Sequence, residues 1–475
     1  MNKAASISLI RRFAYYFLPV AFFLFISSCK KDSFITTSDA LIETSVDSLK
    51  YDTVFTSIGS ITQSFKISNV NNQRLLLSKV KLAGGATSSF KVNINGYAAS
   101  EINDIEIAPN DSLYVFVTVN INPNAANLPF VVKDSIQILF NGNSRVIKLE
   151  AFGQNANFLR NKIIKGNITW TNNLPYVILG SLLVDTAASL TIEAGCRIYS
   201  HANAPIIIDG TLITNGTNQQ PVIFAGDRLD EDYKSFPASW PGIYFRGSSI
   251  DNMLKFTTVK NAYQAIVAEK PSANTNPKVI MQQCIIDNAF DAGIYCVNSS
   301  LQASNSLISN CGKNVQFIYG GDYTLTNCTV AAYSSYISHK NPVLTVSNYA
   351  SQNGNTIAAD LNAIFRNCIF WAEESTVDNE VSVNKQGSTN FTVNFDHCLY
   401  RAVADPPNST LNAVIKNTDP LFDSIDVVKH YFDFRITKNT ASPGIDKGVA
   451  TGFLKDLDDQ PRNIGLTDLG SYEKQ

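Results

Sequence analysis

The sequence is poor in charged residues, in methionine and in histidine. Asp, Glu, Lys and Arg make up 16% of its 475 residues and leave a formal net charge of −2. Binding to nucleic acid requires a clustered basic surface, so the composition argues against nucleic-acid partners. Met occurs 3 times, against 28 Phe and 19 Tyr, a usage that favours β-sheet over helix. The four histidines are scattered, with no pair at metal-ligand spacing: His201, His339, His397 and His430.

What the chain does contain is a series of short β-rich runs between Ser189 and Val330, mostly with Gly or Asn in or beside them. No helical period separates these runs, and their return at short intervals predicts coils that stack into a parallel β-helix. The opening runs, from Ser189 to Phe224, resemble the first coils of right-handed parallel β-helix proteins. The sequence therefore predicts an all-β fold, with a right-handed parallel β-helix (solenoid) over residues 157–415.

The first 28 residues have the organisation of an export signal. Arg11 and Arg12 precede an apolar run from Ala14 to Ile26, which is shorter than the ~20 residues of a membrane-spanning helix. Ile26-Ser27-Ser28-Cys29 resembles the lipobox of bacterial lipoproteins. The resemblance implies cleavage before Cys29, diacylation of its sulfur and a membrane as partner, because several acyl chains anchor durably. The alternative is a buried Cys29 behind an uncleaved anchor.

Further sequence features bear on the cellular location. Lys30 and Lys31 stand where an Asp would retain a Gram-negative lipoprotein at the plasma membrane, so the outer membrane and the cell surface are favoured. Residues 29–45 look like a polar tether. Six Asp-Ser/Thr-aliphatic triplets resemble the O-glycosylation pattern of secreted Bacteroidota proteins; they begin at Asp47, Asp52, Asp111, Asp134, Asp185 and Asp423.

Residues 46–156 carry closely spaced runs with alternating apolar positions, such as Leu113-Tyr114-Val115-Phe116-Val117. Turn sequences such as Asn141-Gly142-Asn143 separate them, which predicts a small β-sandwich. The stretch from Ile107 to Ser112, followed by Ile121-Asn122-Pro123, resembles the immunoglobulin-like sandwiches of the abnormal-spindle/hydin type found near the N-termini of bacterial surface proteins. That resemblance implies a spacer that precedes the solenoid.

Inside the solenoid an apolar residue, two polar residues and a Cys recur as a motif. A polar residue at the third place suits a turn, and Cys at the fourth behaves as a small inward-facing hydrophobe. The intervals are uneven, so either the coils carry loops of varied length or Cys311 belongs to another column. We expect mostly free, buried thiols, with Cys196 and Cys296 outside the pattern. The motif ends at Cys284, Cys311, Cys328, Cys368 and Cys398.

The densest acidic cluster of the solenoid falls in one loop, and it is the candidate ligand or metal site. Carboxylates at this spacing could bind Ca²⁺, and the two aromatic rings could stack on a sugar. The alternative is a solvated loop, with Trp240 packing at the start of the next coil; no other cofactor is expected. The candidate residues are Asp227, Asp230, Glu231, Asp232, Tyr233 and Trp240.

Other acidic stretches give weaker indications of chemistry. A looser cluster runs through Glu373, Glu374, Asp378 and Glu380. Asn417-Thr418-Asp419 matches one motif of pectinase-type hydrolases, but the chain has no Gly-His-Gly, so a turn is the simpler interpretation. No catalytic residue is assigned.

The last segment, residues 416–475, is similar to the closing segment of bacterial β-helix surface proteins called choice-of-anchor Q. Its Asp456-Leu457-Asp458-Asp459-Gln460-Pro461-Arg462 run, with Asp459 where that family usually has Gly, carries the match. The resemblance implies a cap over the last coil, and we expect Arg462 to pair with Asp468 or Glu473.

Together these observations predict an exported, lipid-anchored surface protein that presents a β-helix face to glycans or partner proteins without catalysis. One alternative is a polysaccharide lyase or glycoside hydrolase acting on acidic polysaccharide. Another is a purely structural component of the envelope. Sites on a β-helix are assembled from separate coils, so a missing compact motif does not exclude an enzyme.

Overall fold

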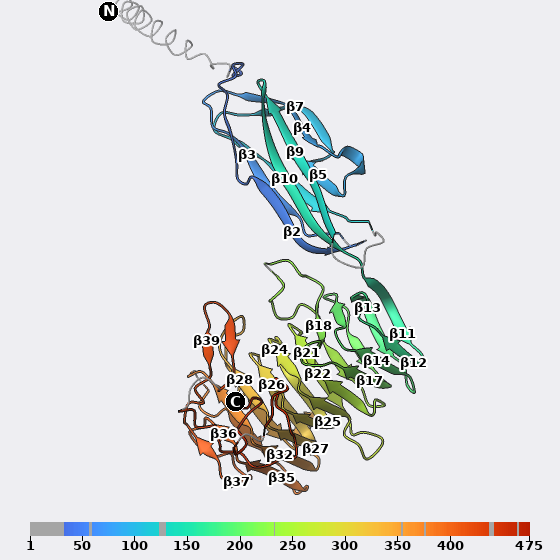
Figure 1. Ribbon diagram of the computed structural model, residues 1–475, viewed down its shortest axis with the longest axis vertical. Helices are drawn as coiled ribbons and strands as arrows, with labels where there is room; N and C mark the ends of the chain where they lie inside the picture. Colours follow the sequence, from blue (N-terminus) through green and yellow to red (C-terminus); the bar gives the residue numbers. More distant parts are fainter. Residues whose placement is uncertain are drawn as a thin grey trace, which may run out of the picture. The chain divides into compact units, whose positions relative to one another are not determined.

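The computed structural model describes residues 33–56, 59–122, 130–231, 233–352, 355–374, 377–436, 441–462 and 465–475. The chain divides into two compact units: the first ends at Gly153, and the second runs from Gln154 to Gln475 (Figure 1). The predicted signal peptide and Cys29 lie outside the described residues. Among the residues that are described, no helix is long and apolar enough to span a bilayer.

The first unit is a sandwich of two five-stranded sheets. Its strands alternate buried and exposed side chains, as β8 (Ser112–Val119) does, so that Leu113, Val115 and Val117 enter the core between the sheets. A short 3₁₀ helix, η1 (Gly85–Thr87), precedes β5. One sheet holds β1 (Ile42–Thr44), β3 (Gln63–Asn69), β8, β5 (Phe90–Ile94) and β6 (Tyr97–Ala98). The other holds β2 (Ser48–Phe55), β10 (Asn143–Gln154), β9 (Phe130–Phe140), β4 (Leu75–Leu82) and β7 (Glu101–Ile107).

The expected tether over residues 29–45 is wrong for the part that the structure describes. Strand β1 pairs with β3, and Ala40 is buried in the core of the sandwich. The backbone N–H of Ile35 donates to Arg74 O, and the Asn141 amide donates to Ile35 O. Residues 33–45 are therefore an edge of the sandwich, because their backbone groups and apolar side chains find partners on it.

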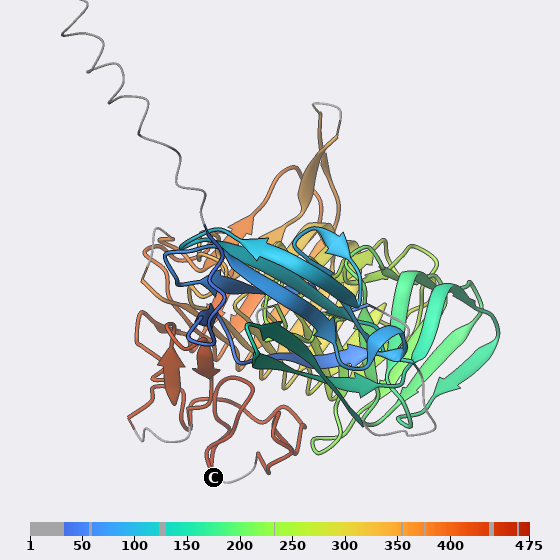
Figure 2. The ribbon, with the colours of Figure 1, turned by 90° about the horizontal axis from the view of Figure 1, so that it is seen from above.

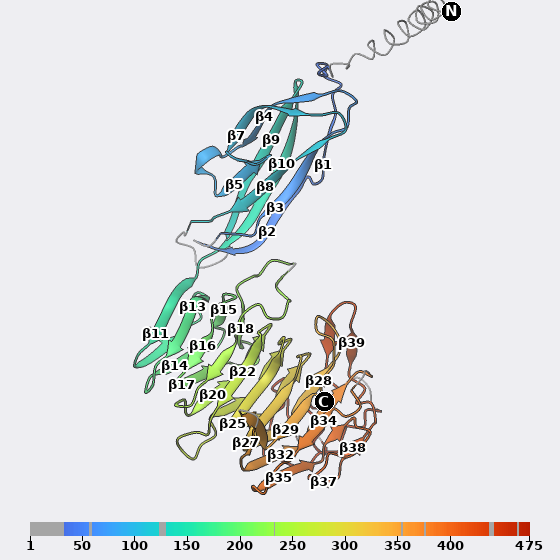
Figure 3. The same ribbon diagram turned by 180° about the vertical axis from the view of Figure 1, so that it is seen from behind.

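The second unit is a 26-stranded parallel sheet wound into coils (Figure 3). Three columns of paired strands make it up, called columns A, B and C in chain order around each coil. Column A holds β12 (Asn167–Trp170), β14 (Ser189–Glu193), β17 (Thr211–Asn215), β20 (Asn252–Lys255), β23 (Val279–Gln282), the second parts of β25 (Ala292–Ser304) and β27 (Val315–Thr326), β32 (Leu361–Arg366), β35 (Phe391–Asp396) and β37 (Thr410–Asn412).

Strands of column B pair in the same parallel manner. They are the first parts of β11 (Asn157–Ile164) and β13 (Tyr176–Val184), then β15 (Arg197–Ser200), β18 (Val222–Gly226), β21 (Thr257–Lys260), β24 (Ile285–Asp287), β26 (Leu307–Ser309), β28 (Thr329–Ala332), β33 (Ile369–Ala372), β36 (Leu399–Tyr400) and β38 (Ile415–Lys416). Column C takes the second parts of β11 and β13, β16 (Ile206–Ile208), β19 (Ile243–Phe245), β22 (Gln264–Glu269), the first parts of β25 and β27, β29 (Leu344–Ser347) and β34 (Val381–Asn384).

Like side chains stack inside the coils, as expected for a β-helix. In column A, Leu325 lies in register with Phe365 and Phe365 with Phe395, whose rings stack at 4.8 Å between centroids. Each coil thus buries apolar surface that it would expose alone. The prediction of an all-β chain, with a right-handed parallel β-helix preceded by an immunoglobulin-like β-sandwich, is confirmed. Two hairpins leave the coils: β30 (Tyr349–Gln352) with β31 (Asn355–Ala358), and β39 (Ser424–Asp426) with β40 (Tyr431–Asp433).

The turns from column A to column B, called the AB turns, explain the Cys motif. Asn327 and Asn367 adopt φ of 52° and 53°, a left-handed conformation that Asn tolerates, and Asn367 Nδ2 donates to Asn327 Oδ1 at 2.9 Å. The next residue of each turn points inward, which places Cys284, Cys328, Cys368 and Cys398 in one column.

The structure decides between the two alternatives for Cys311 and corrects the expectation for Cys196. Cys311 does sit in another column: it follows Asn310 in a turn from column B to column C, and Ser306 takes its place in the AB turns, 22 residues after Cys284. Cys196, expected outside the pattern, lies in the AB column. It directly precedes β15 as Cys284 directly precedes β24, and β15, β18, β21 and β24 are paired in continuous register. All the described cysteines are free and buried, so the prediction of free thiols is confirmed: Cys196, Cys284, Cys296, Cys311, Cys328, Cys368 and Cys398.

The segment from residue 417 to the C-terminus runs along the flank of the coils, where the resemblance implied a cap over the last one (Figure 2). Its Phe434, Leu457 and Tyr472 pack on Leu307 and Ala331 of column B. Its polar groups bind the AB turns: Arg462 Nε donates to Asn305 Oδ1 at 2.7 Å, and the amides of Gln283, Asn327 and Asn367 bond to Asp456 O, Thr451 Oγ1 and Val449 O. The outward faces of column B are apolar, which is why the segment covers this side.

The expected pairing of Arg462 is confirmed with Glu473. Arg462 Nη1 lies 3.2 Å from Glu473 Oε2, and both side chains are buried. Asp459 adopts a φ of 63°, a left-handed conformation that glycine favours and Asp tolerates.

Candidate functional site

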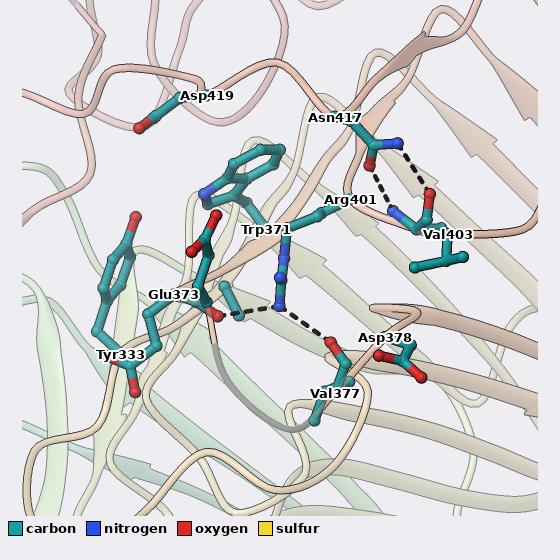
Figure 4. A pocket seen from close by; sticks show the side chains of 12 residues that line it. Tyr333, Trp371, Glu373, Val377, Asp378, Arg401, Val403, Asn417 and Asp419 are labelled. Atoms are coloured by element: carbon teal, nitrogen blue, oxygen red, sulfur yellow. Dashed lines mark hydrogen bonds between the residues drawn. The ribbon is translucent and has the colours of Figure 1, made fainter.

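The turns from column B to column C, called the BC turns, vary in length along the solenoid. After β28 the connection runs over residues 333–343, and after β33 it runs over 373–380. These two loops meet the residues that follow β36 and β38, and together they surround a cleft of about 540 Å³ (Figure 4). Its lining comes from Tyr333, Trp371, Ala372, Glu373, Glu374, Val377, Asp378, Arg401, Ala402, Val403, Asn417 and Asp419.

Strand register explains why two aromatic rings line the cleft. In β33, Phe370 points into the core, so Trp371 next to it points outward, in register with Ala331 of β28. Tyr333 follows β28 directly. Trp371 is 8% exposed and packs against Ile369, Leu399 and Leu469, which leaves a small part of its indole facing the cleft.

Arg401 fixes the floor of the cleft. Its Nη2 lies 3.0 Å from Glu373 O, 3.1 Å from Val377 O and 2.7 Å from Glu380 Oε1. Glu380 is fully buried, and both its carboxylate oxygens accept from His339 Nε2, at 3.0 and 3.1 Å. The guanidinium charge is therefore matched by a carboxylate behind the cleft. Arg401 ties both ends of the 373–377 stretch to the solenoid wall.

The far wall is fixed by the side chain of Asn417, which bonds to backbone groups as a neighbouring strand would. The Asn417 amide bonds to Ala402 in both directions, donating to Ala402 O at 2.9 Å and accepting from Ala402 N at 2.9 Å. Asp419 Oδ1 accepts from Leu421 N at 2.8 Å, which holds the start of the C-terminal segment. Both residues belong to the Asn417-Thr418-Asp419 motif, which is thus a turn that also lines the cleft.

The electrostatics of the cleft are acidic. Glu373, Glu374, Asp378 and Asp419 all line it, and Asp378 is exposed. Burial raises the pKa of the Tyr333 hydroxyl far above its ordinary value, and the negative charges of Asp419 and Glu373 raise it further. Tyr333 therefore stays neutral and presents a hydroxyl that can donate a hydrogen bond to a ligand oxygen.

The acidic loop chosen from the sequence lies elsewhere, and its acids bond to nearby basic groups. Asp227 Oδ2 lies 2.7 Å from His201 Nδ1. The two carboxylate oxygens of Asp230 accept from Arg228 Nε at 2.8 Å and from Arg228 Nη2 at 2.9 Å. Glu231 accepts from Lys234 Nζ at 2.5 Å. Asp232 lies outside the described residues.

The two aromatic candidates of that loop also differ from each other. Trp240 is 1% exposed and donates its indole N–H to Lys260 O, so it packs at the start of the next coil and offers no face to a sugar. Tyr233 is exposed, with the Arg228 guanidinium 3.9 Å from its ring centroid. Among the described residues, no three His, Cys, Asp or Glu side chains are arranged to hold a metal ion.

Sequence reasoning did not single out Trp371, Tyr333 or Arg401. The acids of the cleft were noticed, but as two unrelated stretches, because the residues that join them are brought together only by coil stacking. One signal was present: a tryptophan stands at the outward position of the strand at 369–372, beside a run of acids.

Known proteins resemble part of the chain. Residues 162–271 match the model of a family described as a pectate-lyase-like β-helix domain. No curated protein matches the sequence. A crystal structure of a protein of unknown function from Porphyromonas gingivalis W83 is similar at 15% identity, with a TM-score of 0.18, over 26% of this chain and 50% of that one.

A second solved structure is a family 123 glycoside hydrolase from Clostridium perfringens, studied for glycolipid glycan hydrolysis. It is 10% identical with a TM-score of 0.18, over 25% of this chain and 26% of that one. The chain thus spans half of the first structure and about a quarter of the second. Similarity at this level says nothing about activity.

Proposed function

We propose that this protein is an exported, lipid-anchored surface protein that binds glycans in the cleft around Trp371 and Arg401 without cleaving them. The observation that carries the proposal is the composition of the cleft. It combines aromatic surface from Trp371 and Tyr333 with polar groups held in fixed positions by Arg401 and Asn417. Sites for small ligands have this mixture of apolar wall and few positioned polar groups.

Two other observations support it. The β-helix match at residues 162–271 is to a family named after pectate lyase, which acts on a polysaccharide. The lipobox-like Ile26-Ser27-Ser28-Cys29 and the choice-of-anchor Q-like segment support an anchored location at the surface of a Bacteroidota-type cell.

Glycan binding is tested by a glycan array followed by calorimetry with the mature chain. Tyr333→Phe removes one hydroxyl, and Asp419→Asn removes one charge while keeping its shape. We expect each to weaken binding by roughly three- to thirtyfold, the value of one or two hydrogen bonds. Gln302→Ala, at an outward position of column A, is the control. Absence of binding to every glycan on the array would refute the proposal.

The anchor is tested separately. We expect the wild-type protein to partition into detergent with acyl chains on Cys29, and Cys29→Ser to be released from membranes. A water-soluble wild-type protein that still carries residues 1–28 would refute lipidation.

A second function, glycoside hydrolysis, is favoured by one feature of the cleft. The Tyr333 hydroxyl lies beside two carboxylates, Glu373 and Asp419, and paired carboxylates are the usual acid and base of glycosidases. A reducing-end assay on glycans that bind decides this. Turnover that Asp419→Asn abolishes would establish an enzyme.

A further inference from the structure

A second hollow adjoins the cleft on the same flank of the solenoid. It encloses about 410 Å³ and shares Val377 and Asp378 with the first. Its other walls come from Lys340 and Pro342 of one BC loop, from Ser382 and Asn384 of β34, and from Pro406 after β36. Because two residues border both hollows, they are neighbouring parts of one groove, with the Val377–Asp378 stretch between them.

The size of each hollow limits what it can hold. Sites for small molecules enclose roughly 300–1,000 Å³, so each hollow alone accommodates a ligand of a few sugar rings at most. A longer chain has to cross Asp378 to use both.

The first hollow repels anions. Glu373, Glu374, Asp378 and Asp419 line it, and its one guanidinium, Arg401, already pairs with buried Glu380 at 2.7 Å. An anionic ligand within a few ångströms of these carboxylates is repelled by them, and near a protein surface this repulsion is stronger than in bulk water.

The second hollow offers little to offset that repulsion. Lys340 contributes one positive charge and Asp405 one negative charge. A hydrogen bond from Lys416, at 2.8 Å, lowers the pKa of Asp405, so this carboxylate is ionised at neutral pH. The amide of Asn384 donates to the hydroxyl of Ser382 at 3.0 Å, and both groups line the hollow. They carry no charge, so they can bond to an uncharged ligand.

We propose that the groove binds a linear glycan without acidic groups, long enough to cross Asp378 and occupy both hollows. This rests on the proposed glycan-binding function and narrows it: the ligand is a neutral or amino-bearing chain, not a uronate polymer. The name of the matching family suggests an acidic polysaccharide as ligand, whereas the acidic lining of the cleft favours one without acidic groups.

The test is calorimetry with neutral disaccharides and hexasaccharides (gluco-, xylo-, manno- and N-acetylchito-series) and with hexagalacturonate. We expect at least one neutral hexasaccharide to bind roughly tenfold or more tighter than its disaccharide, and hexagalacturonate to bind more weakly than either. Ser382→Trp, an outward residue of column C, fills the second hollow. It should remove most of the hexasaccharide advantage and leave disaccharide binding within about twofold.

Gln302→Trp introduces the same ring at an outward position of column A, and it should change neither affinity. Asp378→Lys tests the charge of the groove at an exposed residue. It should strengthen hexagalacturonate binding by roughly tenfold or more through charge alone. All three variants are compared with wild type by thermal unfolding.

The outcomes separate the two proposals. If no glycan binds, the proposed function fails and the inference fails with it. If glycans bind but hexagalacturonate binds best, or if hexasaccharide and disaccharide bind equally, the inference alone is overturned. The same holds if folded Ser382→Trp leaves the hexasaccharide affinity unchanged.

Discussion

The AB turns and the BC turns belong to the same coils, yet the chain uses them in opposite ways. In the AB turns, Asn305, Asn327 and Asn367 repeat one left-handed conformation, and the C-terminal segment bonds to them. In the BC turns, loops of different length leave two hollows between them. Repetition on one edge stabilises the stack, and variation on the other edge leaves the hollows of the candidate site, since loops tolerate insertion where strand register does not.

The largest expected effect comes from breaking the AB side at Arg462. This residue donates to Asn305 Oδ1 and to Gly470 O and pairs with Glu473, with its side chain 1% exposed. Arg462→Ala leaves Glu473 buried without its partner, and breaking a buried pair in this way costs about 3–5 kcal/mol. Urea unfolding of the variant and wild type measures it. A loss below 1 kcal/mol would mean that the C-terminal segment is not held by this contact.

Asn367 tests the turn ladder itself. It is fully buried, its φ is 53°, and its amide bonds to Asn327 Oδ1 and to both the N–H and the O of Val449. Asn367→Ala loses these bonds and gains strain, so we expect the unfolding free energy to fall by about 2–4 kcal/mol. Asn394→Ala, at an outward position of column A, is the matched control and should change it by less than about 0.5 kcal/mol. Equal losses for the two variants would contradict a special role for the ladder.

The thiol column predicts instability at high pH. Burial raises the pKa of Cys196 to about 11 and that of Cys284 to about 12, from an ordinary value of 9.0. Between pH 9 and 11 the unfolded chain therefore loses these protons while the folded chain keeps them. The unfolded state binds fewer protons, so stability falls as pH rises, by up to about 1.4 kcal/mol per pH unit for each thiol.

Urea titrations at pH 8, 9, 10 and 11 measure this slope, and Cys284→Ala should make it shallower. Ellman's reagent provides the companion measurement: the native protein should react slowly, and the denatured, unreduced protein should expose the seven thiols that the structure describes as free. A stability profile that is flat up to pH 11 would contradict inward-facing thiols.

The sequence predicted the solenoid because its repeating features are local. Alternating strands and the polar-Cys turns follow from two or three adjacent residues each, and register follows from the buried column they make. Cys311 was ambiguous because the BC turn at Asn310 uses the same local sequence as an AB turn, and only pairing with neighbouring coils distinguishes them.

The candidate site was less accessible to the same reasoning. The acids at 227–231 are close in sequence, but Arg228, Lys234 and His201 bond to them, so the density of acids along the sequence was a misleading guide to a binding site. The cleft instead depends on four connections from successive coils. Its aromatic members look like ordinary strand and loop residues until stacking places them beside Asp419.

The smallest expected effect on stability comes from removing one carboxylate charge on each side of the solenoid and comparing the two variants. Asp456 sits on the AB side, 1% exposed, and its two carboxylate oxygens accept from the N–H groups of Gln460 and Glu473 at 2.7 and 2.9 Å. Asp378 sits exposed between the two hollows on the BC side. Asp456→Asn turns one of its acceptors into a donor that faces an N–H, so we expect a loss of about 1–3 kcal/mol.

Asp378→Asn should change the unfolding free energy by no more than about 0.5 kcal/mol, because water already solvates that carboxylate. Its effect should appear in binding alone, as a weaker discrimination against hexagalacturonate, read by calorimetry beside the urea curves. If Asp378→Asn destabilised the fold as much as Asp456→Asn, the acids of the cleft would be part of the scaffold, and the division between a structural edge and a binding edge would have to be abandoned.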